Sequence, residues 1–164
     1  MNATAVGTVG QSRGWAFWLC VAVLVAATCD ISYATGFSYL RSGVPPSRIL
    51  QSVASGVLGR DAFQGGAPAA ALGLVLHYVN AFLIAAIFFF AASRVPSIVR
   101  NPIVTGPIYG LIVYLVMNFV VIPMSRIGVV PHPPLIIRAT EIPVHMFLIG
   151  LPIAVAARNA FVRA

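Results

Sequence analysis

The sequence predicts an all-α membrane protein, with four transmembrane helices in a bundle and a short interfacial amphipathic helix between the first two. Hydrophobic residues make up 60% of the 164 residues and charged residues only 8%, whereas roughly 25% of a soluble domain is charged. Four long stretches carry at most one charge each, and a spanning helix needs about 20 mostly apolar residues. We therefore expect residues 1–164 to form a single integral membrane domain.

The first transmembrane helix is predicted near 15–37. Only Asp30 interrupts the uncharged stretch between Arg13 and Arg41. An arginine before an apolar run is also typical of a secretory signal peptide. Three further long apolar runs follow, and a secreted remainder would not contain them. The segment is therefore interpreted as a retained first helix, with Trp15 and Trp18 as anchors at the membrane interface.

A short amphipathic helix is predicted near 47–59, after Pro45-Pro46 stop any continuation of the first helix. Its apolar residues recur at helical spacing: Ile49, Leu50, Val53, Val57 and Leu58. The polar residues fall on the opposite side: Arg48, Gln51, Ser52 and Ser55. This pattern suits a helix that lies in the plane of the lipid head groups.

The remaining transmembrane helices are predicted near 69–93, 102–123 and 140–160, from uncharged stretches at 62–93, 101–125 and 142–157. The third helix contains Gly106-x-x-x-Gly110, a pair of small residues that lets two helix backbones approach closely. The same pair fits a contact within the chain and a contact between two copies of it, so a homo-oligomer stays open.

The charges exclude several classes of function. All ten basic residues are arginines, with a formal net charge of +7, and they are dispersed singly between apolar runs. This distribution suits lipid head groups in a bilayer and indicates no nucleic-acid partner. The sequence contains no lysine and no phosphate-binding glycine loop. No Ser-His-Asp arrangement falls at one depth, so catalysis is not expected.

Polar residues of four predicted helices fall in one slab near the same side of the membrane: Asp30, His77, Asn118, Glu141 and His145. At 1.5 Å per residue, the predicted helix ends place Asp30 about 10 Å and His77 about 12 Å deep. Glu141 begins the last helix, and His145 follows it on the same face. Ionisable groups inside a membrane are costly, and by default they indicate a functional site.

Four interpretations of the slab stay open. It can be a buried hydrogen-bond network that fixes helix packing. Alternatively, His77, Glu141 and His145, together with Asp30, can ligate a metal such as zinc, iron or manganese. A haem between the two histidines is a third interpretation, and a protonatable relay that responds to external pH is the fourth.

Three segments resemble the YagU-like family of bacterial inner-membrane proteins. They are Leu76-His77 through Ser93-Arg94-Val95-Pro96, Met117-Asn118 with Pro123-Met124-Ser125, and Glu141-Ile142-Pro143-Val144-His145. The resemblance covers roughly residues 55–160, and the stretch between the first two helices is shorter here. It implies a four-span protein of the bacterial inner membrane without an assigned activity or a known cofactor. It also singles out His77, Glu141 and His145.

Two hypotheses of function follow. In the first, the outward-facing cluster binds a proton, a metal or a small ligand. In the second, the chain is an accessory subunit of a larger membrane complex, and the slab only locks its helices together. Arginines are balanced, five on each side. The terminal amine and Arg13, which lies close to the first helix, favour a cytoplasmic N-terminus, and four spans then return the C-terminus to the cytoplasm.

Overall fold

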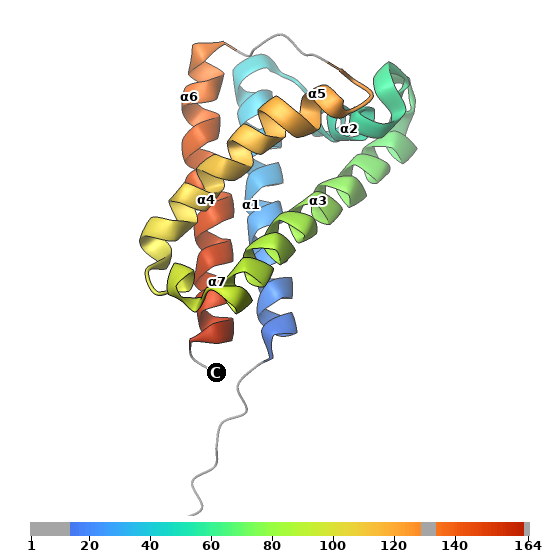
Figure 1. The fold of residues 1–164 in the computed structure, drawn as a ribbon. Coiled ribbons are helices and arrows are strands. Elements are labelled where there is room, and N and C mark those ends of the chain that lie inside the picture. Colours follow the sequence, from blue (N-terminus) through green and yellow to red (C-terminus); the bar gives the residue numbers. More distant parts are fainter. Residues whose placement is uncertain (1–13, 129–133, 163–164) are drawn as a thin grey trace, which may run out of the picture.

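Four long apolar helices and one short helix make up the described part of the chain, as the sequence predicts (Figure 1). The computed structural model describes residues 14–128 and 134–162. The spans are α1 (Trp15–Ser42), α3 (Gly66–Arg94), Pro102–Met124 and Leu135–Phe161. No strand occurs in either described stretch. Less than a third of the most apolar window of each span is buried, so the outward surface is apolar, as in an integral membrane protein.

Each of the last two spans consists of three helical segments. The third span contains α4 (Pro102–Val116), the π-helical turn η3 (Met117–Val121) and α5 (Ile122–Met124). The fourth contains α6 (Leu135–Val144), the π-helical turn η4 (His145–Gly150) and α7 (Leu151–Phe161). Two 3₁₀ turns, η1 (Gly59–Gln64) and η2 (Pro96–Val99), complete the connections.

The spans alternate in direction, so the bundle has two distinct ends (Figure 1). We call them the Trp15 end and the Ser42 end, after the first and last residues of α1. The Trp15 end gathers the start of α1, the end of α3, the start of α4 and α7. The Ser42 end gathers α2 (Pro46–Leu58), the start of α3, α5 and the start of α6.

Two of the predicted helices are too short at the Ser42 end. The first helix runs to Ser42 and not to residue 37, and it stops at Gly43, whose φ of 66° suits glycine. The Gly43 N–H donates to the Tyr39 carbonyl oxygen at 2.8 Å. The last helix starts at Leu135, directly after Pro134, and not near 140. Both changes add turns at the Ser42 end, so the slab lies deeper than the sequence indicated.

The helix α2 is confirmed, but two of its polar residues face inward. Gln51 and Ser55 are buried, whereas Val57 is half exposed. The Gln51 amide donates to the Gly66 carbonyl at 3.0 Å, so its polar group is satisfied next to α3. A Cβ at Gly73 would overlap the backbone carbonyl of Leu50. Glycine at this position therefore allows α2 to lie directly on α3.

Each π turn ends two residues before a proline. The Ile122 N–H donates to the Met117 carbonyl, and the Leu151 N–H donates to the Met146 carbonyl, both across five residues. The next residues, Pro123 and Pro152, have no N–H, and a proline ring clashes with the carbonyl four residues earlier. Widening the preceding turn moves that carbonyl away, which is a common origin of π turns.

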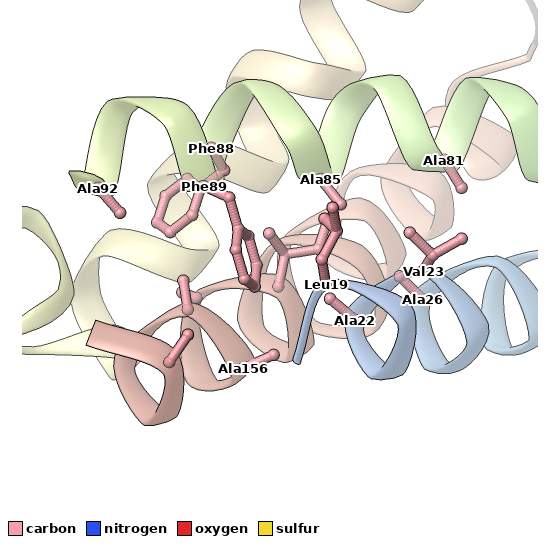
Figure 2. Packing of buried hydrophobic residues seen from close by; sticks show 14 of the residues in the cluster. Leu19, Ala22, Val23, Ala26, Ala81, Ala85, Phe88, Phe89, Ala92 and Ala156 are labelled. Carbon is pink, nitrogen blue, oxygen red and sulfur yellow. The ribbon is translucent and has the colours of Figure 1, made fainter. Parts of the chain in front are cut away.

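The apolar core is built from small residues and fills the Trp15 half of the bundle (Figure 2). Ala85, Ile153 and Ala154 are fully buried, and Phe88 and Phe89 of α3 fill the space between the helices. Alanine lets helices approach closely in a membrane, where dispersion contacts stabilise their association. This core holds α1, α3 and α7 together below the polar slab.

Glycines let α4 cross the fourth span at backbone contact. A Cβ at Gly110 would overlap the carbonyl oxygen of His145, and one at Gly150 would overlap that of Gly106. A Cβ at Gly106 would lie 2.7 Å from the Cα of Leu151. The Gly106-x-x-x-Gly110 face is thus occupied by a helix of the same chain, which holds the backbone of His145 against α4.

Candidate functional site

The candidate site lies directly above the apolar core on three helices. The uppermost core residues of α1, α3 and η4 are Ala27, Ala81 and Ile149. Asp30, His77 and His145 come three or four residues further toward the Ser42 end. Residues three or four apart share one face of a helix, so these side chains continue the same inward-facing stripes.

Asp30 and His77 form a partly buried pair between α1 and α3. Their side chains are 21% and 13% exposed, and the Asp30 Oδ2 atom lies 3.9 Å from the His77 Nε2 atom. The same Nε2 atom is 2.9 Å from the carbonyl oxygen of Ala27. Because a carbonyl only accepts, Nε2 carries the hydrogen and donates it. The other ring nitrogen, Nδ1, is then the one that can accept a proton.

Glu141 and His145 form the second pair, on the fourth span. The His145 Nδ1 atom lies 2.9 Å from the Glu141 backbone carbonyl, so Nδ1 donates and Nε2 is the basic nitrogen. The ring of Tyr114 meets the His145 ring edge-on at 5.3 Å. The Glu141 carboxyl group interacts electrostatically with both His145 and Asp30. Asp30 is therefore within electrostatic range of both pairs.

The actual helix ends place this cluster deep in the bundle. Asp30 is 12 residues before the last residue of α1, or about 18 Å at 1.5 Å per residue. Glu141 is six residues into α6, or about 9 Å, and not at the start of the helix as predicted.

Asn118 lies in η3, and its amide donates to the Tyr114 carbonyl at 3.0 Å, within its own helix. Asp61, the remaining acidic residue, is exposed in η1. The neighbouring polar contact between α3 and the third span is instead made by Asn80, whose amide lies 3.4 Å from the Met117 sulfur.

The three residues proposed as metal ligands, His77, Glu141 and His145, do not gather around one point. Over residues 14–128 and 134–162, no group of three or more His, Cys, Asp or Glu side chains has a geometry that could hold a metal ion. A haem bound through both Nε2 atoms would require His77 to give up its bond to Ala27.

Three hydroxyl groups near the site escaped the sequence analysis. The Tyr33 hydroxyl is buried and has no hydrogen-bond partner in the described part of the chain. It lies three residues after Asp30, and this spacing could have indicated it. The Thr28 hydroxyl and the Tyr78 hydroxyl are 2.9 Å apart and join α1 to α3 beside His77. No spacing within one helix could have revealed the contact between Thr28 and Tyr78, because the two residues belong to different helices.

Comparison with protein-family models, with curated proteins and with solved structures finds no match to this chain.

Proposed function

We propose that this is a multi-pass protein of the bacterial inner membrane, in which Asp30, His77, Glu141 and His145 bind a proton that enters from the Ser42 end. The observation that supports the proposal most is the central place of Asp30. It lies on the buried stripe of α1, beside His77 and within electrostatic range of Glu141. Two carboxylates that interact in a medium of low dielectric constant repel each other, and protonation of one of them relieves the repulsion.

The fixed orientation of the imidazoles also supports a proton as the ligand. Each ring donates one N–H to a backbone carbonyl and so keeps its other nitrogen basic. A backbone carbonyl cannot take the hydrogen away, so the tautomer persists whatever the state of the carboxylates. The ring contact with Tyr114 further restricts the rotation of His145. These are preorganised proton acceptors, since no reorientation precedes protonation.

The proposal can be tested by following the ring signals of His77 and His145 by NMR from pH 8 to pH 5. We expect the pH dependence of each ring's signals to differ from that of the wild type when the neighbouring carboxylate is neutralised in Asp30→Asn or Glu141→Gln. The matched control is Asp61→Asn, because Asp61 is exposed in η1. Ring signals whose pH dependence all three substitutions leave unchanged would identify the cluster as a packing network without proton linkage.

We further propose membership of the YagU-like family and a cytoplasmic location for both termini. The two described ends carry unequal numbers of arginines, with five at the Ser42 end and three at the Trp15 end. Arg13 and Arg163, which the sequence assigns to the inner side, lie outside the described residues. Labelling of single cysteines at exposed positions tests the orientation. A cysteine in place of Ser42 should react with an impermeant maleimide added to intact cells, and one in place of Ser93 should not.

A further inference from the structure

Two consecutive residues of α3 bond to two consecutive residues of α1, next to the candidate site. The His77 Nε2 atom donates to the Ala27 carbonyl at 2.9 Å, and the hydroxyl oxygens of Tyr78 and Thr28 are 2.9 Å apart. The rings of His77 and Tyr78 also meet edge-on, with centroids 5.9 Å apart. The hydroxyl pair, as we call Thr28 and Tyr78, therefore joins α1 to α3 at the level of the imidazole.

The hydroxyl pair lies near the middle of both spans, where water offers no alternative partner. Thr28 is 13 residues after Trp15 and 14 residues before Ser42, the two ends of α1. Tyr78 is 12 residues after the first residue of α3 and 16 residues before the last. Thr28 is exposed on the surface of the bundle, which faces lipid in a membrane. A hydroxyl group that loses its partner in hydrocarbon stays unsatisfied, and this cost favours a persistent bond.

The N–H group of His77 has two acceptors on α1 close to each other. The Ala27 carbonyl oxygen is 2.9 Å from Nε2, and the Asp30 Oδ2 atom is 3.9 Å from it. The carboxylate is too far away for a hydrogen bond, since N–H···O bonds are about 2.7–3.2 Å long. A shift of about 1 Å between α1 and α3 would exchange the two acceptors. An ionised carboxylate is the stronger acceptor, so bonding to the carbonyl requires that the two helices be held in place.

We propose that the hydroxyl pair positions His77 so that it donates to Ala27 and leaves Asp30 free to bind the proton. This inference rests on the function proposed above. The titratable side chains around His77 are Asp30 on α1 and, within electrostatic range of Asp30, Glu141 on α6, which also interacts with His145 of η4. While Nε2–H bonds to the carbonyl, Asp30 and the Nδ1 atom of His77 are two separate proton acceptors. If Nε2–H bonded to the carboxylate, the two groups would share one hydrogen bond and Asp30 would no longer be free.

NMR of the full-length protein with isotope-labelled histidine tests this proposal through the Nε2–H signal of His77, assigned with a His77→Gln variant. Tyr78→Phe and Thr28→Val each remove one hydroxyl group. We expect the Nε2–H proton signal to shift downfield in both, because the hydrogen then bonds to the carboxylate instead of the carbonyl. Adding Asp30→Asn to Tyr78→Phe should reverse that shift, since an amide oxygen is a weaker acceptor. Thr28→Ser keeps a hydroxyl group and should keep the wild-type signal. A signal that Tyr78→Phe and Thr28→Val leave unchanged would overturn the proposal.

Two comparisons separate this result from a general loosening of α3 and from failure of the proposed function. Tyr109→Phe also removes a tyrosine hydrogen bond to α3, at the Ile84 carbonyl, seven residues away from His77, and it should leave the Nε2–H signal unchanged. An equal shift in Tyr109→Phe would contradict a specific role of the hydroxyl pair. If neither Asp30→Asn nor Glu141→Gln alters the pH dependence of the ring signals, the proposed function fails, and this inference fails with it. If they alter it while the hydroxyl variants leave Nε2–H in place, only the positioning role is overturned.

Discussion

Gly110→Ala should separate α4 from the fourth span and weaken the fold. A Cβ at this position would lie 2.6 Å from the carbonyl carbon of His145 and from the Cα atom of Met146. Carbon atoms in contact are normally about 3.5–4.0 Å apart, so the two helices must move apart by about 1 Å. The neighbouring atoms belong to the backbone, and no rotamer change can make room for the new methyl group.

The magnitude follows from the cost of overpacking. A forced insertion into a well-packed interior typically costs about 1–3 kcal/mol. For a protein of 150–250 residues, each kcal/mol lowers the melting temperature by about 2–4 °C, so we expect a decrease of about 2–12 °C. The matched control is Gly36→Ala in α1, where a Cβ meets nothing within 4 Å. Alanine should be neutral or stabilising there, by up to about 1 kcal/mol.

Thermal unfolding in detergent, followed by circular dichroism, measures both variants under identical conditions. Because the contact lies within one chain, Gly110→Ala should unfold at lower temperature without any change in the elution volume of the folded protein. A Gly110→Ala variant as stable as Gly36→Ala would refute the close backbone crossing. A change from dimer to monomer would instead show that the glycine face serves contacts between copies.

Two further predictions concern contacts of α3. Gly73→Ala should push α2 away, because the new Cβ would overlap the Leu50 carbonyl. The change can be followed with a Ser55→Cys reporter in a protein whose native cysteines are replaced, because Ser55 is fully buried. The reporter should react faster with a maleimide in Gly73→Ala, and an unchanged rate would count against direct packing of α2 on α3. Tyr109→Phe removes a 2.7 Å hydrogen bond to a carbonyl of α3 and should cost about 0.6 kcal/mol, a typical value in membrane proteins. The control is Tyr39→Phe, because Tyr39 is exposed, and it should leave the free energy of equilibrium unfolding unchanged. Equal losses of stability in the two variants would contradict the Tyr109 hydrogen bond.

The number of spans could be predicted from the sequence because it depends on composition. Long uncharged stretches must be helical in a bilayer, where every backbone polar group needs a partner within the segment. Helix ends were less predictable. Gly43, a residue that favours a helix C-terminus, gives a sharper boundary than the loss of hydrophobicity near residue 37. The start of the last helix at Leu135 was predictable in principle, because proline is common at the beginning of a helix.

The inward side of α2 could not be predicted from amphipathicity. The hydrophobic pattern assumes that polar residues face water, but the apolar residues of a membrane protein can face lipid instead. Gln51 turns inward because the Gly66 carbonyl accepts its hydrogen bond, and that partner lies 15 residues away in the chain. Similarly, the spacing of Glu141 and His145 correctly placed them on one face, but their relation to Asp30 depends on how three helices cross.

The π turn in the fourth span explains how His145 comes to lie above the core. His145 is eight residues before Ile153, which is fully buried. In a regular α-helix, eight residues correspond to a rotation of about 800°, or 80° beyond two full turns. The extra residue of η4 removes about 100° from that rotation. The side chain of His145 therefore lies within about 20° of the side chain of Ile153 around the helix axis. Without the π turn, the imidazole would point well to one side of the core stripe. Two residues outside the candidate site therefore position it from the side of the apolar core. Pro152 widens the turn, and Gly150 allows the backbone contact with α4.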